Sequence, residues 1–375
     1  MKKTLCLLIC FFVLTINVSA APQLDIKAKS VILTEASTGN VMYEQNSDER
    51  LPMASVTKVM TMLLTMEAID SGRIAMDDMV TASERAKSMG GSTIFLDAGE
   101  QMSVHDLLKG IAVASGNDAC VAMAEYIAGS ESEFVRMMNE RAKQLGMNNT
   151  NFVNTNGLDT EGHYSSARDI AIMSRELIKH EKIFEFTTIW TDSLRGGEFG
   201  LANTNKLIRF YNGANGLKTG STDEALFCLS ASAKRDGMQL IAVVLGSPTS
   251  QDRFDAARTL LDYGFANYKM MKVANTDEAI AFVPVEKGTE QSVVLKCESE
   301  FTMLTSKSGQ EDIKIKTQIP ESVPAPVKKG DKVGKIIFFS KGEQICEMAL
   351  TAAEDVQRKN YLVIFVDIIK RWLTV

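Results

Sequence analysis

The stretch that organises the chain is Pro-Met-Ala-Ser-Val-Thr-Lys-Val-Met, residues 52–60. It contains a Ser-x-x-Lys pattern, Ser55 and Lys58, at the head of an apolar run that continues to Met66. A helix turns by about 100° per residue, so the two side chains lie one turn apart on one side. A lysine deprotonates a serine hydroxyl only when burial lowers its pKa, and the apolar flanks favour such burial. The stretch therefore predicts a helical Ser55 nucleophile with Lys58 as its base.

Two further short motifs follow in the order that a serine-lysine site requires. Ser-Gly-Asn at 115–117 connects two segments with helical apolar spacing, and Lys-Thr-Gly at 218–220 precedes a β-prone run. Each triplet alone is weak evidence, since the first is also typical of a helix cap and the second of a turn. Lys-Ser-Gly at 307–309 lies in an expected hairpin turn and is interpreted as a chance match. Order and context make the three earlier motifs specific.

The first two motifs supply the nucleophile and proton transfers of acyl transfer to serine. Ser55 attacks, and Lys58, held neutral, takes its proton. Ser115 can relay a proton to the departing nitrogen, and Asn117 can orient Lys58 and the substrate amide. We therefore predict Ser55, Lys58 and Ser115 as catalytic residues and Asn117 as a substrate-binding residue.

The third motif supplies substrate binding and charge. Lys218 helps to keep Lys58 neutral and attracts a substrate carboxylate, which Thr219 can hydrogen-bond. Gly220 allows a strand edge to approach a peptide closely. Ser221 follows, and its backbone N–H, with that of Ser55, is a candidate oxyanion donor. We predict all four residues, 218–221, as substrate-binding.

Composition excludes several other function classes. The net charge is −6 and no basic cluster is present, which argues against nucleic-acid binding. The three histidines, His105, His163 and His180, each stand alone, and no cysteine has a ligand at metal spacing. No Gly-x-Ser-x-Gly elbow supports a Ser-His-Asp triad. The sequence therefore predicts neither a metal nor a cofactor.

Both ends of the chain carry segments outside the predicted globular fold. Lys2 and Lys3 precede the apolar run 5–18, and Val-Ser-Ala at 18–20 suits cleavage before Ala21, so residues 1–20 are predicted to be a secretory signal peptide. An uncleaved membrane anchor is the alternative, although the run is short for a span. Residues 356–375 are predicted to form an amphipathic helix on a membrane surface, or else a terminal helix packed on the preceding domain.

Between these ends we expect two domains in an α+β protein. In residues 21–270, strands open the segment, helices fill its middle, and a strand pair and a helix close it, which indicates an antiparallel sheet covered by helices. In residues 271–355, short β-prone segments broken by proline and glycine predict a small all-β domain. Cys120 and Cys228 are expected to be buried thiols, and whether Cys297 and Cys346 pair is left open.

The three motifs, in this order, resemble those of the D-alanyl-D-alanine carboxypeptidases, the type-5 low-molecular-mass penicillin-binding proteins. Gly-Leu-Asp at 157–159 and Tyr-Ser-Ser-Ala-Arg-Asp at 164–169 also look like that family's intervening stretch, and the resemblance covers nearly the whole mature chain. It implies a β-lactamase/transpeptidase-like catalytic domain that removes the terminal D-alanine from peptidoglycan pentapeptide stems. It also implies acylation of the same serine by penicillin. From the predicted signal peptide and C-terminal amphipathic helix we expect an exported protein, attached to the outer face of the cytoplasmic membrane.

Three alternatives remain. A class A β-lactamase shares the motif order, but that family typically shows Ser-Asp-Asn at the second motif and a Glu-x-x-Leu-Asn loop, which is missing between Asn117 and Lys218. A DD-endopeptidase of the same superfamily is the second. The third alternative is not an enzyme: it is an envelope protein that recognises penicillin but whose site is catalytically inactive. Ser221 stands where some members of the family have histidine, which leaves the finer substrate preference open.

Overall fold

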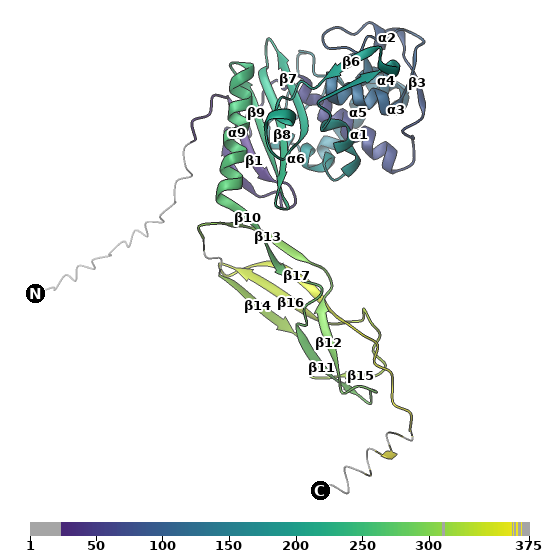
Figure 1. Ribbon diagram of the computed structural model, residues 1–375, viewed down its shortest axis with the longest axis vertical. Coiled ribbons are helices and arrows are strands. Elements are labelled where there is room, and N and C mark those ends of the chain that lie inside the picture. The colour runs from purple at the N-terminus through teal and green to yellow at the C-terminus, as the bar shows by residue number, and fades with distance from the viewer. Residues whose placement is uncertain (1–23, 310–311, 362, 364, 367–368, 370–375) are drawn as a thin grey trace, which may run out of the picture.

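A computed structural model describes residues 24–309, 312–361, 363, 365–366 and 369. The predicted signal peptide lies outside these residues, as does much of the predicted C-terminal helix. Figure 1 shows a helix-rich first part followed by a β-rich second part. The predicted α+β class, with an antiparallel sheet covered by helices and then an all-β domain, is confirmed.

The first part is built on a five-stranded sheet with the order β2-β1-β9-β8-β7. All neighbouring strands are antiparallel. The sheet strands are β1 (Ser30–Glu35), β2 (Val41–Gln45), β7 (Ala214–Thr222), β8 (Leu226–Arg235) and β9 (Met238–Ser247). The opening strands β1 and β2 form a hairpin, and β7 forms an edge of the sheet.

The two faces of the sheet are covered by different helices. Side chains alternate across a strand, so Leu240 and Val244 of β9 pack with Leu260 of α9 (Ser250–Asn267), while Ile241 and Val243 belong to the core on the other face. Helix α6 (Ala167–Leu177) covers that other face. Ser166 caps the start of this helix, because its Oγ accepts from the Asp169 N–H at 3.1 Å.

The remaining elements of the first part form a helical cluster beside β7. In chain order they are η1 (Ala54–Thr57), α1 (Lys58–Asp70), β3 (Met79–Thr81), α2 (Glu84–Lys87), β4 (Gln101–Ser103), α3 (Val104–Lys109), η2 (Gly110–Ala114), α4 (Asn117–Ala128), α5 (Glu131–Gln144), η3 (Glu181–Ile183), α7 (Phe184–Thr187), β5 (Thr191–Leu194), η4 (Arg195–Gly197), β6 (Phe199–Ala202) and α8 (Leu207–Phe210).

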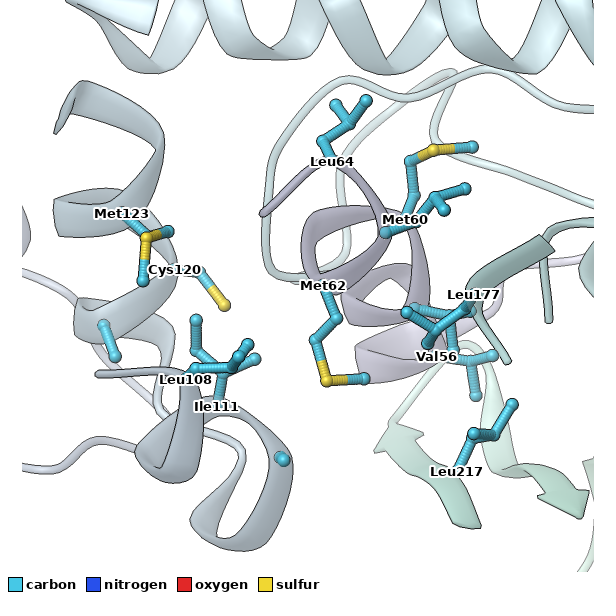
Figure 2. Close-up of a cluster of buried hydrophobic side chains, with 14 of the residues drawn as sticks. Val56, Met60, Met62, Leu64, Leu108, Ile111, Cys120, Met123, Leu177 and Leu217 are labelled. Atoms are coloured by element: carbon cyan, nitrogen blue, oxygen red, sulfur yellow. The ribbon is translucent and has the colours of Figure 1, made fainter. Parts of the chain in front are cut away.

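Helix α1 lies at the centre of this cluster. Ten of its thirteen residues are buried, on all sides of the helix. Figure 2 shows Met62 of α1 facing Ile111, and Met60 and Leu64 on the same helix pointing to other neighbours. A helix that is apolar on every side is stable only inside a protein core. The element that carries Lys58 is therefore rigidly held.

The second part is made of strands. Strands β10 (Tyr268–Ala274) and β13 (Phe301–Ser306) form a two-stranded ribbon. A six-stranded sheet has the order β14-β16-β17-β12-β11-β15. Its strands are β11 (Ala281–Glu286), β12 (Ser292–Cys297), β14 (Ile313–Gln318), β15 (Val323–Pro324), β16 (Lys332–Ser340) and β17 (Glu343–Ala352).

The ribbon attaches the second part to α9. Strand β10 begins at Tyr268, directly after the last residue of the helix. Lys307, which follows β13, donates from its amine to the Phe265 carbonyl at 2.7 Å and from its backbone N–H to the Asn267 carbonyl at 2.7 Å. Both carbonyls belong to the last turn of α9, whose end favours a cation. The Lys-Ser-Gly triplet at 307–309 thus has a structural role.

Two other sequence expectations can be compared with the described residues. Cys120 and Cys228 are buried thiols as predicted, and Cys297 and Cys346 are not bonded to each other. Within the described part of the tail, Tyr361 and Phe365 are exposed. Among the described residues, no helix has the length and apolar character needed to cross a membrane.

Candidate active site

Ser55 and Lys58 meet at the junction of two helical elements. Ser55 lies in the 3-10 turn η1 rather than in the α-helix that the sequence predicted, and Lys58 is the first residue of α1. The Lys58 amine lies 2.9 Å from Ser55 Oγ. Ala54, just before the serine, has a φ of +48°, a strained value for a residue with a Cβ. Such strain at the residue before a nucleophile is typical of functional sites.

Burial defines the chemistry of Lys58. Its side chain is fully buried and contacts three oxygens: Ser55 Oγ, Asn117 Oδ1 at 2.6 Å and the Asn156 carbonyl at 2.6 Å. Burial lowers the pKa of Lys58 to about 8, and the nearby Cys120 and Asp118 oppose this only in part. A substantial neutral fraction near pH 8 is what a general base requires.

The second motif follows a widened helical turn. Helix α3 passes into the π-helical turn η2, which ends at Ser115 with a φ of +64°. Such π turns often occur at functional sites. Helix α4 then begins at Asn117, which is 2% exposed. Ser115 is buried between the two helical elements, which the sequence predicted on either side of it.

The loop at 90–96 supports the second motif. Asn117 donates from Nδ2 to the Gly90 carbonyl at 2.7 Å and from its backbone N–H to the Ser92 carbonyl at 2.7 Å. The carboxylate of Asp118 accepts from the Ile94 and Leu96 N–H groups. These bonds fix the side chain of Asn117 with its oxygen toward Lys58. The Gly-Gly-Ser-Thr corner at 90–93 therefore borders the site.

The third motif lies on the edge strand β7, against the nucleophile. A Cβ added to Gly220 would lie 2.9 Å from the backbone nitrogen of Ser55, closer than real Cβ contacts. Only glycine permits this approach of β7 to the serine, whereas the expected close approach of a peptide to Gly220 stays a prediction. Ser221 is exposed directly after it, and Thr219 is buried just before it.

Lys218 brings a second buried amine to the site. It is 1% exposed and donates to the Thr219 carbonyl at 2.8 Å. Burial lowers the pKa of Lys218 well below its usual value, and the charge on Lys58 lowers it further. Two amines that repel each other in one buried site favour a single shared proton over two.

Two site residues come from the loop at 146–165. Asn156 supplies the carbonyl that contacts Lys58. Gly157 has a φ of +88°, and a Cβ there would overlap the Ala54 carbonyl oxygen and lie 2.8 Å from Thr57 Oγ1. In the sequence, only the Gly-Leu-Asp pattern at 157–159 pointed to this part of the site, and it did so through the family resemblance alone.

A histidine that the sequence left without a role supports the nucleophile from behind. His163 Nδ1 accepts from the Val153 N–H at 3.0 Å, so its Nε2 carries the proton and donates to Thr57 Oγ1 at 2.8 Å. Thr57 then donates to the Ala54 carbonyl at 2.8 Å. Burial lowers the pKa of His163 to about 4, so the ring stays neutral at physiological pH. This chain of bonds fixes the residue before Ser55.

The structure brings residues from four distant segments together at Ser55. Direct contacts join Ser55, Lys58 and Asn117, and Gly220 closes against the serine. Lys218, Thr219 and Ser221 lie on the same strand as Gly220, and Ser115 ends the turn before Asn117. The arrangement joins a buried amine, a serine hydroxyl and the edge strand of a sheet, which suits acyl transfer from an extended peptide.

Comparisons with known proteins agree with this arrangement. The D-alanyl-D-alanine carboxypeptidase family (Peptidase_S11) matches residues 16–249, and the C-terminal domain of penicillin-binding protein 5 matches residues 268–358. The chain is 47% identical, over 91% of its length and 88% of the relative's, to the D-alanyl-D-alanine carboxypeptidase DacF of Bacillus subtilis.

Solved structures give the same result. Penicillin-binding protein 5 from Haemophilus influenzae aligns with a TM-score of 0.73 and 34% identity, over 90% of this chain and 99% of that one. Penicillin-binding protein D2 from Listeria monocytogenes in its ampicillin-bound form aligns with a TM-score of 0.60 and 32% identity, over 65% of this chain and 100% of that one. The motifs, the fold and these matches together establish that the chain belongs to the D-alanyl-D-alanine carboxypeptidase family.

Proposed function

We propose that the protein is a serine-type D-alanyl-D-alanine carboxypeptidase that removes the terminal D-alanine from peptidoglycan pentapeptide stems. The observation that carries the proposal is the Lys58 amine, buried and within 2.9 Å of the Ser55 hydroxyl. Family membership supplies the substrate class, because the relatives are named for this activity.

In the acylation step, Ser55 Oγ attacks the carbonyl of the penultimate D-alanine. The neutral Lys58 amine takes the hydroxyl proton as the Oγ–C bond forms. The backbone N–H groups of Ser55 and Ser221 stabilise the developing oxyanion. Ser115 passes a proton to the departing nitrogen, so the C–N bond breaks to release D-alanine as an amine. The short bond from Lys58 to Asn117 supports the assigned orientation of the base.

Binding of the substrate carboxylate supports this protonation pattern. The terminal carboxylate lies beside Thr219 and Lys218, and a nearby anion raises the pKa of an amine. The shared proton then favours Lys218, which leaves Lys58 neutral as a base. The substrate backbone adds alongside β7, the edge strand of the sheet that carries Lys218 and Thr219.

In the deacylation step, water attacks the acyl-enzyme carbonyl and returns a proton to Ser55 Oγ through Lys58. Penicillin acylates Ser55 by the same attack, with the β-lactam C–N bond in place of the peptide bond. An ampicillin-bound structure of a relative that covers 65% of this chain supports the β-lactam as a ligand class. No step requires a metal or a cofactor.

The protein acts outside the cytoplasm, at the outer face of the cytoplasmic membrane. The predicted signal peptide at 1–20 and the predicted amphipathic segment at 356–375 support this location, together with the exposed apolar side chains of Tyr361 and Phe365. Co-flotation of the mature chain with anionic phospholipid vesicles tests the attachment. A version ending at residue 355 should stay in the soluble fraction, and equal flotation of both would contradict the assignment.

The reaction is tested by D-alanine release from a diacetyl-Lys-D-Ala-D-Ala peptide, with the mature protein and its Ser55→Ala variant. We expect release by the wild type and none by the variant. Fluorescent penicillin should label the wild type only. Rapid penicillin hydrolysis without D-alanine release would instead indicate a β-lactamase, and release by the variant would exclude Ser55 as the nucleophile.

A further inference from the structure

A threonine outside the three motifs lies at the open side of the candidate site. The Oγ1 atoms of Thr204 and Thr219 are 2.6 Å apart, so one hydroxyl donates to the other. Thr219 is buried, whereas Thr204 is exposed. The pair therefore joins the proposed substrate-binding strand to the protein surface.

Buried amide side chains hold Thr204 in place on both sides. Asn203 donates from Nδ2 to the Ile189 carbonyl at 2.7 Å and accepts at Oδ1 from the Asn205 N–H at 2.9 Å. Asn205 donates from Nδ2 to the carbonyl of Gly216 in β7 at 3.1 Å. Both asparagines are buried, while the threonine between them is not. The segment thus presents one hydroxyl from a rigid support.

Thr204 also lies near the second motif. Its backbone N–H donates to the carbonyl of Val113 at 3.4 Å, in the π-helical turn that ends at Ser115. The segment at 203–205 therefore bridges the turn that carries Ser115 and the strand that carries Thr219. A hydroxyl at this bridge is well placed to contact the end of a substrate that lies along β7.

We propose that Thr204 is a second hydroxyl ligand for the terminal carboxylate of the substrate, acting as a pair with Thr219. The proposal rests on the proposed function. A carboxylate only accepts hydrogen bonds, and each hydroxyl has one proton to donate. In the free protein the pair uses one of these protons internally. When the carboxylate binds, both hydroxyls turn outward and each donates to one of its oxygens.

This pair distinguishes a free carboxylate from a blocked C-terminus. A C-terminal amide has one oxygen and an NH2 group, which cannot accept the second bond. One of the two hydroxyls would then lose its charged acceptor. Since hydrogen bonds to charged groups are stronger than neutral ones, Thr204 should contribute to the preference for the end of a chain over an internal peptide bond.

The test compares Thr204→Val, which removes the hydroxyl but keeps the shape, with Thr204→Ser, which keeps the hydroxyl. Thr188→Val is the matched control, because Thr188 is exposed and, among the described residues, its hydroxyl bonds only to the Phe184 carbonyl of the preceding helix α7, at 2.6 Å. The measurement is kcat/KM for diacetyl-Lys-D-Ala-D-Ala and for its C-terminal amide.

We expect Thr204→Val to lower kcat/KM for the acid by about 10- to 100-fold and to change the amide by less than about threefold. The serine variant and the Thr188 control should keep the wild-type ratio of acid to amide. If the amide reacts too slowly, the two forms are compared as inhibitors of Ser55 acylation by fluorescent penicillin.

The proposal would be overturned if Thr204→Val kept the wild-type ratio of kcat/KM for the acid to kcat/KM for the amide. This holds whether both kcat/KM values fall equally or neither falls. Wild-type protein that is labelled by penicillin yet releases no D-alanine from the acid would refute the proposed function instead. The two failures are therefore distinguishable, because the first appears only in the variant and the second in the wild type.

Discussion

Replacement of Gly157 by alanine should disable Ser55 without touching any reacting group. Gly157 has a φ of +88°, and an added Cβ would overlap the Ala54 carbonyl oxygen and lie 2.8 Å from Thr57 Oγ1. Comfortable carbon contacts begin near about 3.5 Å, so the loop must retreat by roughly 1 Å or more. The neighbouring Asn156 carbonyl, which contacts the Lys58 amine at 2.6 Å, would move with it.

The expected loss follows from these two effects. The left-handed backbone costs an alanine about 1–2 kcal/mol of stability. A displacement of about 1 Å at a catalytic group costs roughly 100-fold in rate. We therefore expect Gly157→Ala to reduce Ser55 acylation by fluorescent penicillin, and D-alanine release, by about 100-fold.

Gly162→Ala is the matched control in the same loop. Gly162 has a φ of +81°, but its added Cβ would meet nothing closer than 3.8 Å. Gly162→Ala has the same cost of a left-handed backbone as Gly157→Ala, but its Cβ overlaps no neighbouring atom. It should therefore lower the thermal stability of the protein and change its activity little. Equal acylation rates in the two variants would refute the argument that the approach of Gly157 to Ala54 positions the nucleophile.

Three further predictions concern the surroundings of this site. The rate of Ser55 acylation by penicillin should rise with pH through about 8 and then level off, because Lys58 acts in its neutral form; a flat profile between pH 6 and 9.5 would contradict this assignment. His163→Ala should slow Ser55 acylation by roughly five- to tenfold. His163→Gln keeps a hydrogen-bond donor and an acceptor, so it should recover part of the rate. Equal acylation rates in the two variants would argue against the hydrogen-bond role of His163. Lys307→Met should leave Ser55 acylation unchanged but increase proteolysis where α9 meets β10, because the last turn of α9 loses its cation. The control Lys316→Met, at an exposed strand position, should change neither acylation nor proteolysis.

Much of the fold could be predicted because its signals are local. The hairpin at 29–45, the cap at Ser166 and the strand pair before α9 each follow from turn residues and apolar spacing within a few positions. The 3-10 turn at Ser55 could not be predicted, because Ser-x-x-Lys spacing fits an α-helix equally well. Its geometry includes the positive φ of Ala54, and the neighbours of Ala54 include Gly157 and Gly220, which are distant in sequence.

The candidate site divides in the same way. Side chains that act through their chemistry, such as Lys58 and Asn117, could be named from the motifs. Asn156 acts through its backbone carbonyl, which every residue possesses. The amino-acid type at position 156 therefore gives no indication of its role in the site. Thr204 is a common residue in a polar segment, and its position depends on two asparagines whose partners are remote in sequence.

The position of β1 has a consequence for how the protein acquires activity. This strand is the first among the described residues, yet it lies inside the sheet, where Ser30 pairs with Leu245 of β9. In a chain that emerges N-terminus first, β1 cannot pair with β9 until more than two hundred later residues have emerged. Such long-range strand pairing is slow. Strand β7, which carries Lys218, joins the same sheet through β8 and β9. The serine would stay inert during synthesis and export, and penicillin labelling should report completed folding.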